Sequence, residues 1–216
     1  LKRKSPKVLS ELMSISSKIA DLNYVRNHDW SLPFTKKNAR QAVYAFSGDV
    51  YRGLDAYSID SNKIDFMQNT IRIISGLYGL IKPLDLIQAY RLEMGTKLAF
   101  DSNKNLYDFW RKKISEQLNS ELYENEPVLN LASNEYFKAI DNKILKAQIL
   151  DIVFKEKKNN TYKVIGIYAK RARGLMINYI IRNRLTDAEA LKDFSDEGYL
   201  YNQELSSDKT WVYVRG

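Results

Sequence analysis

The sequence predicts an α+β fold: a mixed sheet flanked by helices, in one compact domain over residues 1–216. Up to residue 123, apolar residues recur mostly at the three- and four-residue spacing of helices. After residue 127, several segments alternate between apolar and polar residues, as strands do. Internal repeats, low-complexity tracts and linkers are absent. The pattern therefore favours one domain over several.

The first half is expected to be mainly helical. Pro6 suits a first helical turn, and Thr35 is a candidate cap for a later helix. Segment 28–34 is expected to be a loop anchored by aromatic residues, and segment 91–105 to be irregular. Helices are expected at 6–22, 36–46, 61–75, 83–89 and 106–123, with a turn or short helix at 50–54.

The second half is expected to supply the sheet. Segment 157–160, KKNN, has the composition of a hairpin turn. Ser133 or Asn134 is a candidate cap for the helix that starts with NEYFKAI. Strands are expected at 127–133, 147–156, 161–169 and 209–215, with helices at 134–140, 171–184 and near 187–193.

The composition limits the classes of function that the protein can have. The chain has no cysteine, which excludes disulfides, thiolate catalysis and cysteine-built zinc sites. The net charge of +8 and the pI of about 9.4 suit a nucleic-acid partner. No apolar run is long enough to span a membrane, and no signal-peptide pattern opens the chain, so a cytoplasmic location is expected. Because the chain begins at Leu1, an amino-terminal strand is expected to precede it.

The stretch YAKRARG, 168–174, is the first candidate site. It lies between a predicted strand and a predicted helix, and it carries Lys170, Arg171 and Arg173. Free N–H groups and the positive dipole end make a helix start a ready anion site, whereas they disfavour cations that have no anion. A phosphate-binding end is one interpretation, and a solvated basic rim is the other.

The stretch SGLYGLIKPLD, 75–85, is the second candidate. Its glycines and proline predict a helix-hairpin-helix-like element, in which backbone amides near Gly76 and Gly79 contact phosphates. Lys82 would add positive charge. The alternative is a plain helix C-cap and turn at one of the glycines.

Acid–base candidates are few. His28 is the only histidine, and Asp29 follows it directly, although sequence neighbours seldom point at one another. Glu135 and Tyr136 follow a predicted strand end, where loops often carry function, and Tyr136 and Lys138 could face a groove shared with 168–174. Arg91 and Glu93 are expected to form a structural pair. The chain has no phosphate-binding glycine loop, dinucleotide fingerprint or nucleophile elbow, so no cofactor is expected and catalysis stays open.

Several stretches together resemble one family. They run in order over nearly the whole chain: HDWSLPFTKKNARQAVYAFSGDVYRGL (28–54), ISGLYGLIKPLDLIQAYRLEMGTKL (74–98), LYDFW (106–110), LNLASNEYFK (129–138), IYAKRARGLMINYIIRNRLT (167–186) and DEGYLYN (196–202). They are similar to the peroxide-stress protein family called YaaA.

The resemblance implies a cytoplasmic bacterial protein that protects against hydrogen peroxide, limits free iron and the Fenton damage it causes, and binds DNA through a helix-hairpin-helix-like element and a basic cleft. Arg40, Lys138, Lys170 and Arg173 match the family's basic positions.

Three functions follow from these observations. The leading expectation is a stress protein that binds DNA with little sequence specificity, through a groove that contains Lys138, Lys170, Arg171 and Arg173, with Arg40 nearby. The rival is an enzyme on a nucleotide or nucleic acid, held by the same cations, with His28, Asp29, Glu135 or Tyr136 as acid or base. Direct iron binding would need an oxygen-rich site. The oligomeric state is not predicted.

Overall fold

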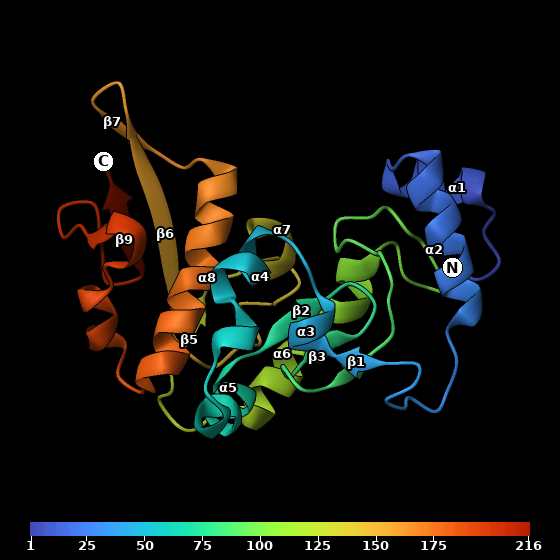
Figure 1. The fold of residues 1–216 in the computed structure, drawn as a ribbon, viewed down its shortest axis with the longest axis horizontal. Coiled ribbons are helices and arrows are strands. Elements are labelled where there is room, and N and C mark those ends of the chain that lie inside the picture. The colour runs from blue at the N-terminus through green and yellow to red at the C-terminus, as the bar shows by residue number, and fades with distance from the viewer. The chain divides into compact units, whose positions relative to one another are not determined.

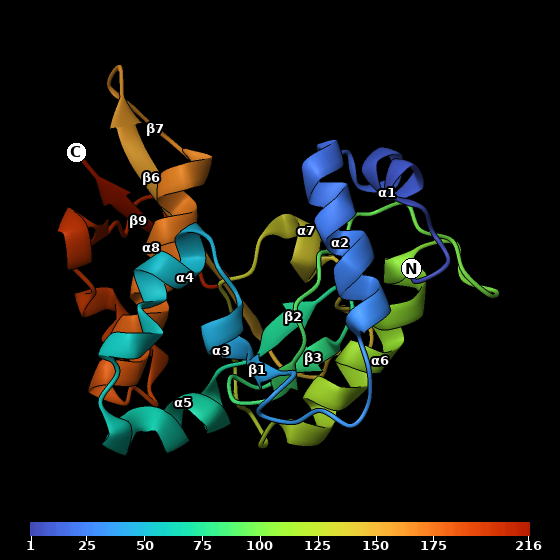
Figure 2. The same ribbon diagram turned by 45° about the vertical axis from the view of Figure 1, so that its right-hand side comes forward.

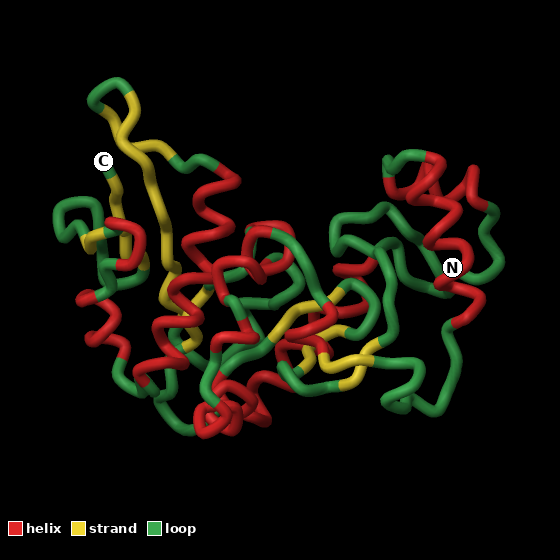
Figure 3. Tube along the Cα trace, viewed as in Figure 1, coloured by secondary structure: helices red, strands yellow, loops and turns green.

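The computed structural model describes residues 1–216 and confirms the α+β class (Figure 1, Figure 3). Its contacts divide the chain into two compact units, and each is described by itself. The first unit comprises residues 1–45, 72–121 and 134–146, and the second comprises residues 46–71, 122–133 and 147–216. Each unit is built from three separate segments, so the chain passes between the units repeatedly.

The first unit opens with a helical hairpin where one helix over 6–22 was expected. Helices α1 (Pro6–Met13) and α2 (Ser17–Asp29) are separated because Ser14 takes a left-handed φ of 52°. The Ser10 hydroxyl donates to the Ile15 carbonyl and stabilises the break. Leu9, Met13 and Ala20 form the apolar contact between the two helices.

The helix expected at 36–46 is mostly absent. Strand β1 (Arg40–Gln41) pairs with β4 (Leu86–Ile87), and only α3 (Ala42–Ala45) is helical. The N–H of Ala42 donates to the Asp85 carbonyl, so a long-range bond overrides local helix propensity. Thr35 caps no helix; its hydroxyl instead accepts from the N–H of Lys37 in a local turn.

The helix-hairpin-helix-like element is also absent. Strands β2 (Ile73–Ser75) and β3 (Gly79–Ile81) form a two-stranded antiparallel hairpin, and β4 occupies the segment expected as helix 83–89. The helix expected at 61–75 is shorter in the structure: α5 (Ile64–Thr70) ends three residues before β2 begins. Short apolar runs such as these suit helices and strands equally well, so their periodicity does not separate the two.

The remaining elements of the first unit lie close to where the sequence predicts them. Segment 91–105 is irregular, and α6 (Leu106–Glu121) follows it. The short helix α7 (Asn134–Phe137) contacts β2. Trp110 of α6 lies against the hairpin and donates from its ring N–H to the Gly76 carbonyl at 3.0 Å.

The second unit is organised around the larger sheet. Its strands are β5 (Val128–Asn130), β6 (Ile149–Lys158), β7 (Thr161–Lys163), β8 (Leu200–Tyr201) and β9 (Thr210–Arg215). The order is β5-β6-β9-β8, and β7 pairs with β6. Strands β5, β6 and β9 are parallel, whereas β7 and β8 pair antiparallel, which makes the sheet mixed as predicted.

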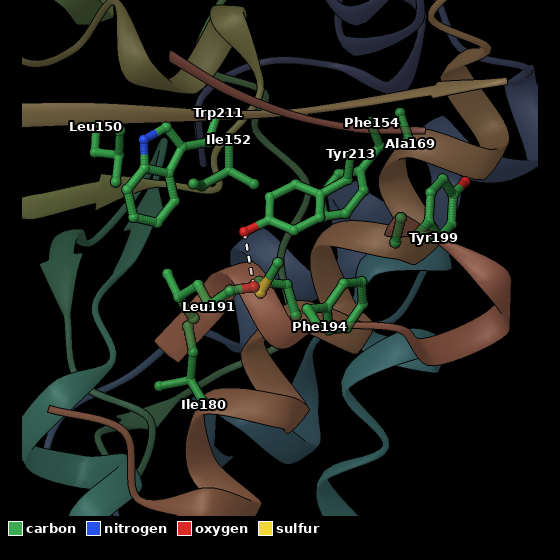
Figure 4. Packing of buried hydrophobic residues seen from close by; sticks show 12 residues of the cluster. Leu150, Ile152, Phe154, Ala169, Ile180, Leu191, Phe194, Tyr199, Trp211 and Tyr213 are labelled. Atoms are coloured by element: carbon green, nitrogen blue, oxygen red, sulfur yellow. Dashed lines mark hydrogen bonds between the residues drawn. The ribbon is translucent and has the colours of Figure 1, made fainter. Parts of the chain in front are cut away.

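Helix α8 (Gly166–Asn183) covers this sheet (Figure 2). It starts five residues before the expected 171, because Ala169, Ala172 and Met176 recur at helical spacing and pack into the core of the unit. Phe154, Phe194, Tyr199 and Tyr213 fill that core, and the Tyr213 hydroxyl donates to the Leu191 carbonyl at 2.8 Å (Figure 4).

Helix α4 (Asp49–Leu54) packs directly on α8, and the contact depends on two glycines. A Cβ on Gly53 would lie 2.2 Å from the Arg171 carbonyl oxygen. A Cβ on Gly174 would lie 1.9 Å from the Val50 carbonyl oxygen. The two backbones therefore touch where α8 carries its cations. The remaining elements of the unit are the short helices η1 (Ala56–Ser58), η2 (Ser61–Lys63), η3 (Ala188–Asp193) and η4 (Asp196–Gly198).

Candidate anion-binding site

The three cations of 168–174 lie within α8 rather than at its start. The helix begins at Gly166, so Lys170 is its fifth residue and Arg173 its eighth. The dipole effect fades within the first turn. The prediction that these cations crowd the positive end of a helix is therefore wrong. An anion site at these residues must be argued from the contacts of their side chains instead.

The charge of the exposed Arg171 is balanced by a carboxylate of the same unit. Its Nη2 lies 2.6 Å from Oε1 of Glu197, and Nε donates to the same oxygen at 2.7 Å. These hydrogen bonds raise the pKa of Arg171 and lower that of Glu197. Glu197 in turn lies 3.5 Å from Arg215, which pairs with Glu156 at 2.9 Å. Arg171 thus belongs to an ion-pair network that joins α8 to β6 and β9.

Arg173, in contrast to Arg171, has no carboxylate partner. Its side chain is partly buried, its Nε is shielded from solvent, and that Nε has no hydrogen-bond partner. Burial lowers the pKa of this guanidinium, and no neighbouring carboxylate acts against that shift. A buried charged donor without an acceptor is costly, which makes it a candidate contact for an anion.

Lys170 lies three residues before Arg173, so the two side chains share one face of α8. Lys170 is exposed, and neither a carboxylate nor a hydrogen-bond acceptor contacts its ammonium group. Like charges at this spacing repel each other. The pair is therefore the candidate anion site of the second unit.

The hairpin glycines have a packing role in the first unit. A Cβ on Gly76 would lie 2.3 Å from the Leu92 carbonyl oxygen. Gly79 has a φ of +74°, and a Cβ there would lie 2.4 Å from the Trp110 ring. The N–H groups of Leu77 and Tyr78 both donate to Ser75 Oγ, at 3.2 and 2.9 Å. Two of the turn amides expected to hold phosphate are therefore already bonded.

The other basic candidates also belong to the first unit. Lys82 lies 3.7 Å from Glu121, which Arg72 contacts at 2.6 Å, so its charge is partly balanced. Lys138 is exposed at the end of α7, and its carbonyl accepts from Arg111 Nε at 3.2 Å. Arg40 is exposed on β1. A groove that these residues share with α8 stays a prediction.

The acid–base candidates are engaged elsewhere. The ring of the exposed His28 lies tilted against that of Tyr24, and its Nδ1 lies 2.9 Å from the Tyr24 carbonyl oxygen; no bond joins it to the exposed Asp29. Glu135 Oε1 accepts from the Gly95 N–H at 2.8 Å. Burial, then Glu135 and Glu93, raises the pKa of Tyr136 to about 12, so its phenol stays protonated at neutral pH.

The structure confirms one predicted ion pair and adds one that the sequence did not predict. The predicted pair of Arg91 and Glu93 is confirmed, with Nη2 and Oε1 2.6 Å apart. Sequence reasoning did not find Glu197 as the partner of Arg171, although DEGYLYN contains it; the two are 26 residues apart and meet only in the fold. The chain forms no cluster of three or more histidine or carboxylate side chains that could hold a metal ion.

Comparisons with known proteins give the family. The family model described as peroxide stress protein YaaA matches residues 1–205. A UPF0246 protein of Acaryochloris marina is 53% identical over 215 residues, which cover this whole chain and 85% of the relative. A UPF0246 protein of Flavobacterium johnsoniae has the same identity and coverage. One from Neisseria meningitidis serogroup B is 49% identical over 217 residues, covering this whole chain and 84% of that protein.

No helix is both long and apolar enough to cross a membrane. The family match extends over nearly all of the chain and confirms the resemblance first seen in the separate sequence stretches. The chain belongs to the peroxide stress protein YaaA family.

Proposed function

We propose that this peroxide stress protein binds DNA through its phosphates, with Lys170 and Arg173 of α8 as contacts. The observation that carries the proposal is the partly buried guanidinium of Arg173, whose Nε lacks a partner, beside an exposed ammonium group without a counter-charge. A phosphate would balance the charge of the guanidinium and relieve the repulsion between the two cations.

Duplex DNA suits the wider charge distribution. The net charge of +8 attracts a polyanion over long range. Contacts to phosphates carry no sequence information, so binding should vary little with sequence and fall steeply with salt. Protection by binding would then act on the DNA itself, which is the target of Fenton damage.

An enzyme acting on a nucleotide is the second candidate. The partial burial of Arg173 favours it, because a compact phosphate fits such a position as well as a DNA backbone does. The acid–base candidates favour it less: burial and the charges of Glu135 and Glu93 disfavour the phenolate that Tyr136 would need to act as a base, and Glu135 is bonded to the Gly95 N–H. We therefore place DNA binding first.

The test is fluorescence anisotropy of a labelled duplex across a salt series, with the double variant Lys170→Gln/Arg173→Gln. The matched control is Arg52→Gln/Lys112→Gln. It removes the same charge from two side chains that are each 73% exposed and already paired with a carboxylate.

We expect the wild type to bind with a steep salt slope, and the α8 variant to lose about two units of that slope. The control should keep it. Equal slopes for both variants would remove α8 from the interface. Displacement of the duplex by a mononucleotide at a similar phosphate concentration would favour the enzyme. The expected limitation of free iron stays a separate prediction, to be tested by measuring chelatable iron in cells that carry the α8 variant.

A further inference from the structure

Apolar side chains are exposed where the sheet of the second unit passes into α8. Val164 is 56% exposed and Ile167 is 60% exposed, and they stand three residues apart, on either side of the first residue of the helix. Single exposed apolar residues are ordinary, but two of them three residues apart, within a stretch of the chain whose charges are all positive, point to an interaction site.

Along the chain, the charged residues around this pair are all basic. From residue 157 to residue 186 the chain has no aspartate or glutamate. The same thirty positions carry eight cations: Lys157, Lys158, Lys163, Lys170, Arg171, Arg173, Arg182 and Arg184. Three of these already have acceptors in the protein: Arg171, Arg182 and Arg184. Lys158, Lys163 and Lys170, which flank the apolar pair along the chain, have no such acceptor.

The β6–β7 hairpin presents these lysines in a defined way. Asn159 and Asn160 form its turn with φ angles of 50° and 59°. Lys158 pairs with Thr161, and Glu156 pairs with Lys163, so Lys158 and Lys163 lie on the same face of the hairpin. In Figure 1 and Figure 2 the hairpin extends beyond the rest of the sheet, and the chain returns from β7 directly into α8.

We propose that Val164 and Ile167 form an apolar wedge that enters between neighbouring base pairs of DNA, while Lys158, Lys163 and Lys170 hold the phosphates beside it. The inference rests on the proposed DNA binding and adds its mode. Proteins that kink DNA combine these two parts: an apolar side chain that unstacks a base step, and flanking cations that hold the backbone.

Charge complementarity selects DNA as the occupant. A protein partner would bury the patch in an interface whose centre is normally poor in charged groups. Here unpaired lysines border the apolar residues closely on both sides along the chain. Tyr168 is not part of the wedge, because the Arg215 guanidinium lies 5.2 Å from the centre of its ring and holds it in place.

The test uses a duplex with 2-aminopurine at one step, whose fluorescence rises on unstacking, together with anisotropy for affinity. The variant is Val164→Ala/Ile167→Ala. The matched control is Leu200→Ala, because Leu200 is also 60% exposed in the same unit but lies on β8.

We expect the wild type and the control to raise 2-aminopurine fluorescence. The wedge variant should lose that signal and about tenfold in affinity, with an unchanged salt slope because it removes no phosphate contact.

Steep salt dependence without a fluorescence rise in the wild type would overturn the wedge but leave phosphate binding intact. A wild type that does not bind the duplex at low salt would overturn both. Binding to anionic lipid vesicles in place of DNA would assign the patch to a membrane surface and also overturn the wedge.

Discussion

Arg171 and Arg173 lie two residues apart on α8, yet only Arg171 has a carboxylate partner, Glu197 at 2.6 Å. Residues two apart on a helix point to different sides. Arg171 therefore meets the loop that carries Glu197, whereas the Arg173 side chain is partly buried with no acceptor for its Nε. This difference separates a structural arginine from a candidate binding arginine.

Replacing Arg173 by Met should not destabilise the protein. Burial lowers the pKa of this guanidinium, so the folded state disfavours its charge, and an apolar side chain of similar length removes that penalty. We expect the free energy of unfolding to rise by about 0.5–2 kcal/mol, measured by urea denaturation. A clear loss of stability would show that Arg173 has a structural role and would weaken the proposed function.

Replacing Arg215 by Met should have the opposite effect. Arg215 contacts Glu156 at 2.9 Å, and Glu156 also accepts from the Tyr199 hydroxyl in a partly buried position. The substitution leaves the Glu156 carboxylate without its cation, at a cost of about 2–4 kcal/mol. Arg52→Met is the control, since the Arg52 side chain is largely exposed and its pair with Asp49 should contribute little. Equal effects of the two substitutions in urea denaturation would contradict this reading.

The stability of the first unit should fall in acid partly through Glu121. Burial alone would raise its pKa, but hydrogen bonds from Gln117 and Arg72 and the charges of Arg72 and Lys82 hold that pKa below the ordinary 4.5. The stabilisation is therefore present above pH 4.5 and is lost as the pH falls through the lower folded value.

Glu121→Gln tests this directly. At pH 7 it should lower the melting temperature by about 2–4 °C, and the difference from the wild type should shrink as the pH falls below 4.5. Glu116→Gln on the same helix is the control, because its pair with Lys112 is exposed and 3.7 Å long. A gap that stays constant with pH would show that Glu121 acts through packing rather than charge.

Replacing a glycine by alanine should change the stability of the protein differently at different positions. Gly79→Ala meets both a φ of +74° and the Trp110 ring, and Gly76→Ala meets the Leu92 carbonyl, so each should cost at least about 1–3 kcal/mol. Gly166→Ala at the start of α8 meets no atom within 4 Å and should stabilise the protein by about 0.4–1 kcal/mol. Thermal melts of the three variants check the order. A tolerated Gly76→Ala would reopen a phosphate-binding role for that turn.

Long patterns in the sequence were sufficient for much of the fold. Helix α6 and strands β6 and β9 lie close to where periodicity predicts them, because each is long enough to show its period clearly. The family too followed from the sequence, since its stretches keep their order along the chain. The candidate cations were also found there, because charge clusters need no fold to be seen.

The short elements needed the fold. Segment 73–87 folds as strands because β2 pairs with β3 and β4 pairs with β1, and β1 is nearly fifty residues away along the chain. Within YAKRARG, the sequence does not distinguish Arg171 from Arg173. Glu197 reaches one and not the other, because the position of a counter-charge depends on how α8 packs with the η4 loop and on which side of the helix each arginine points.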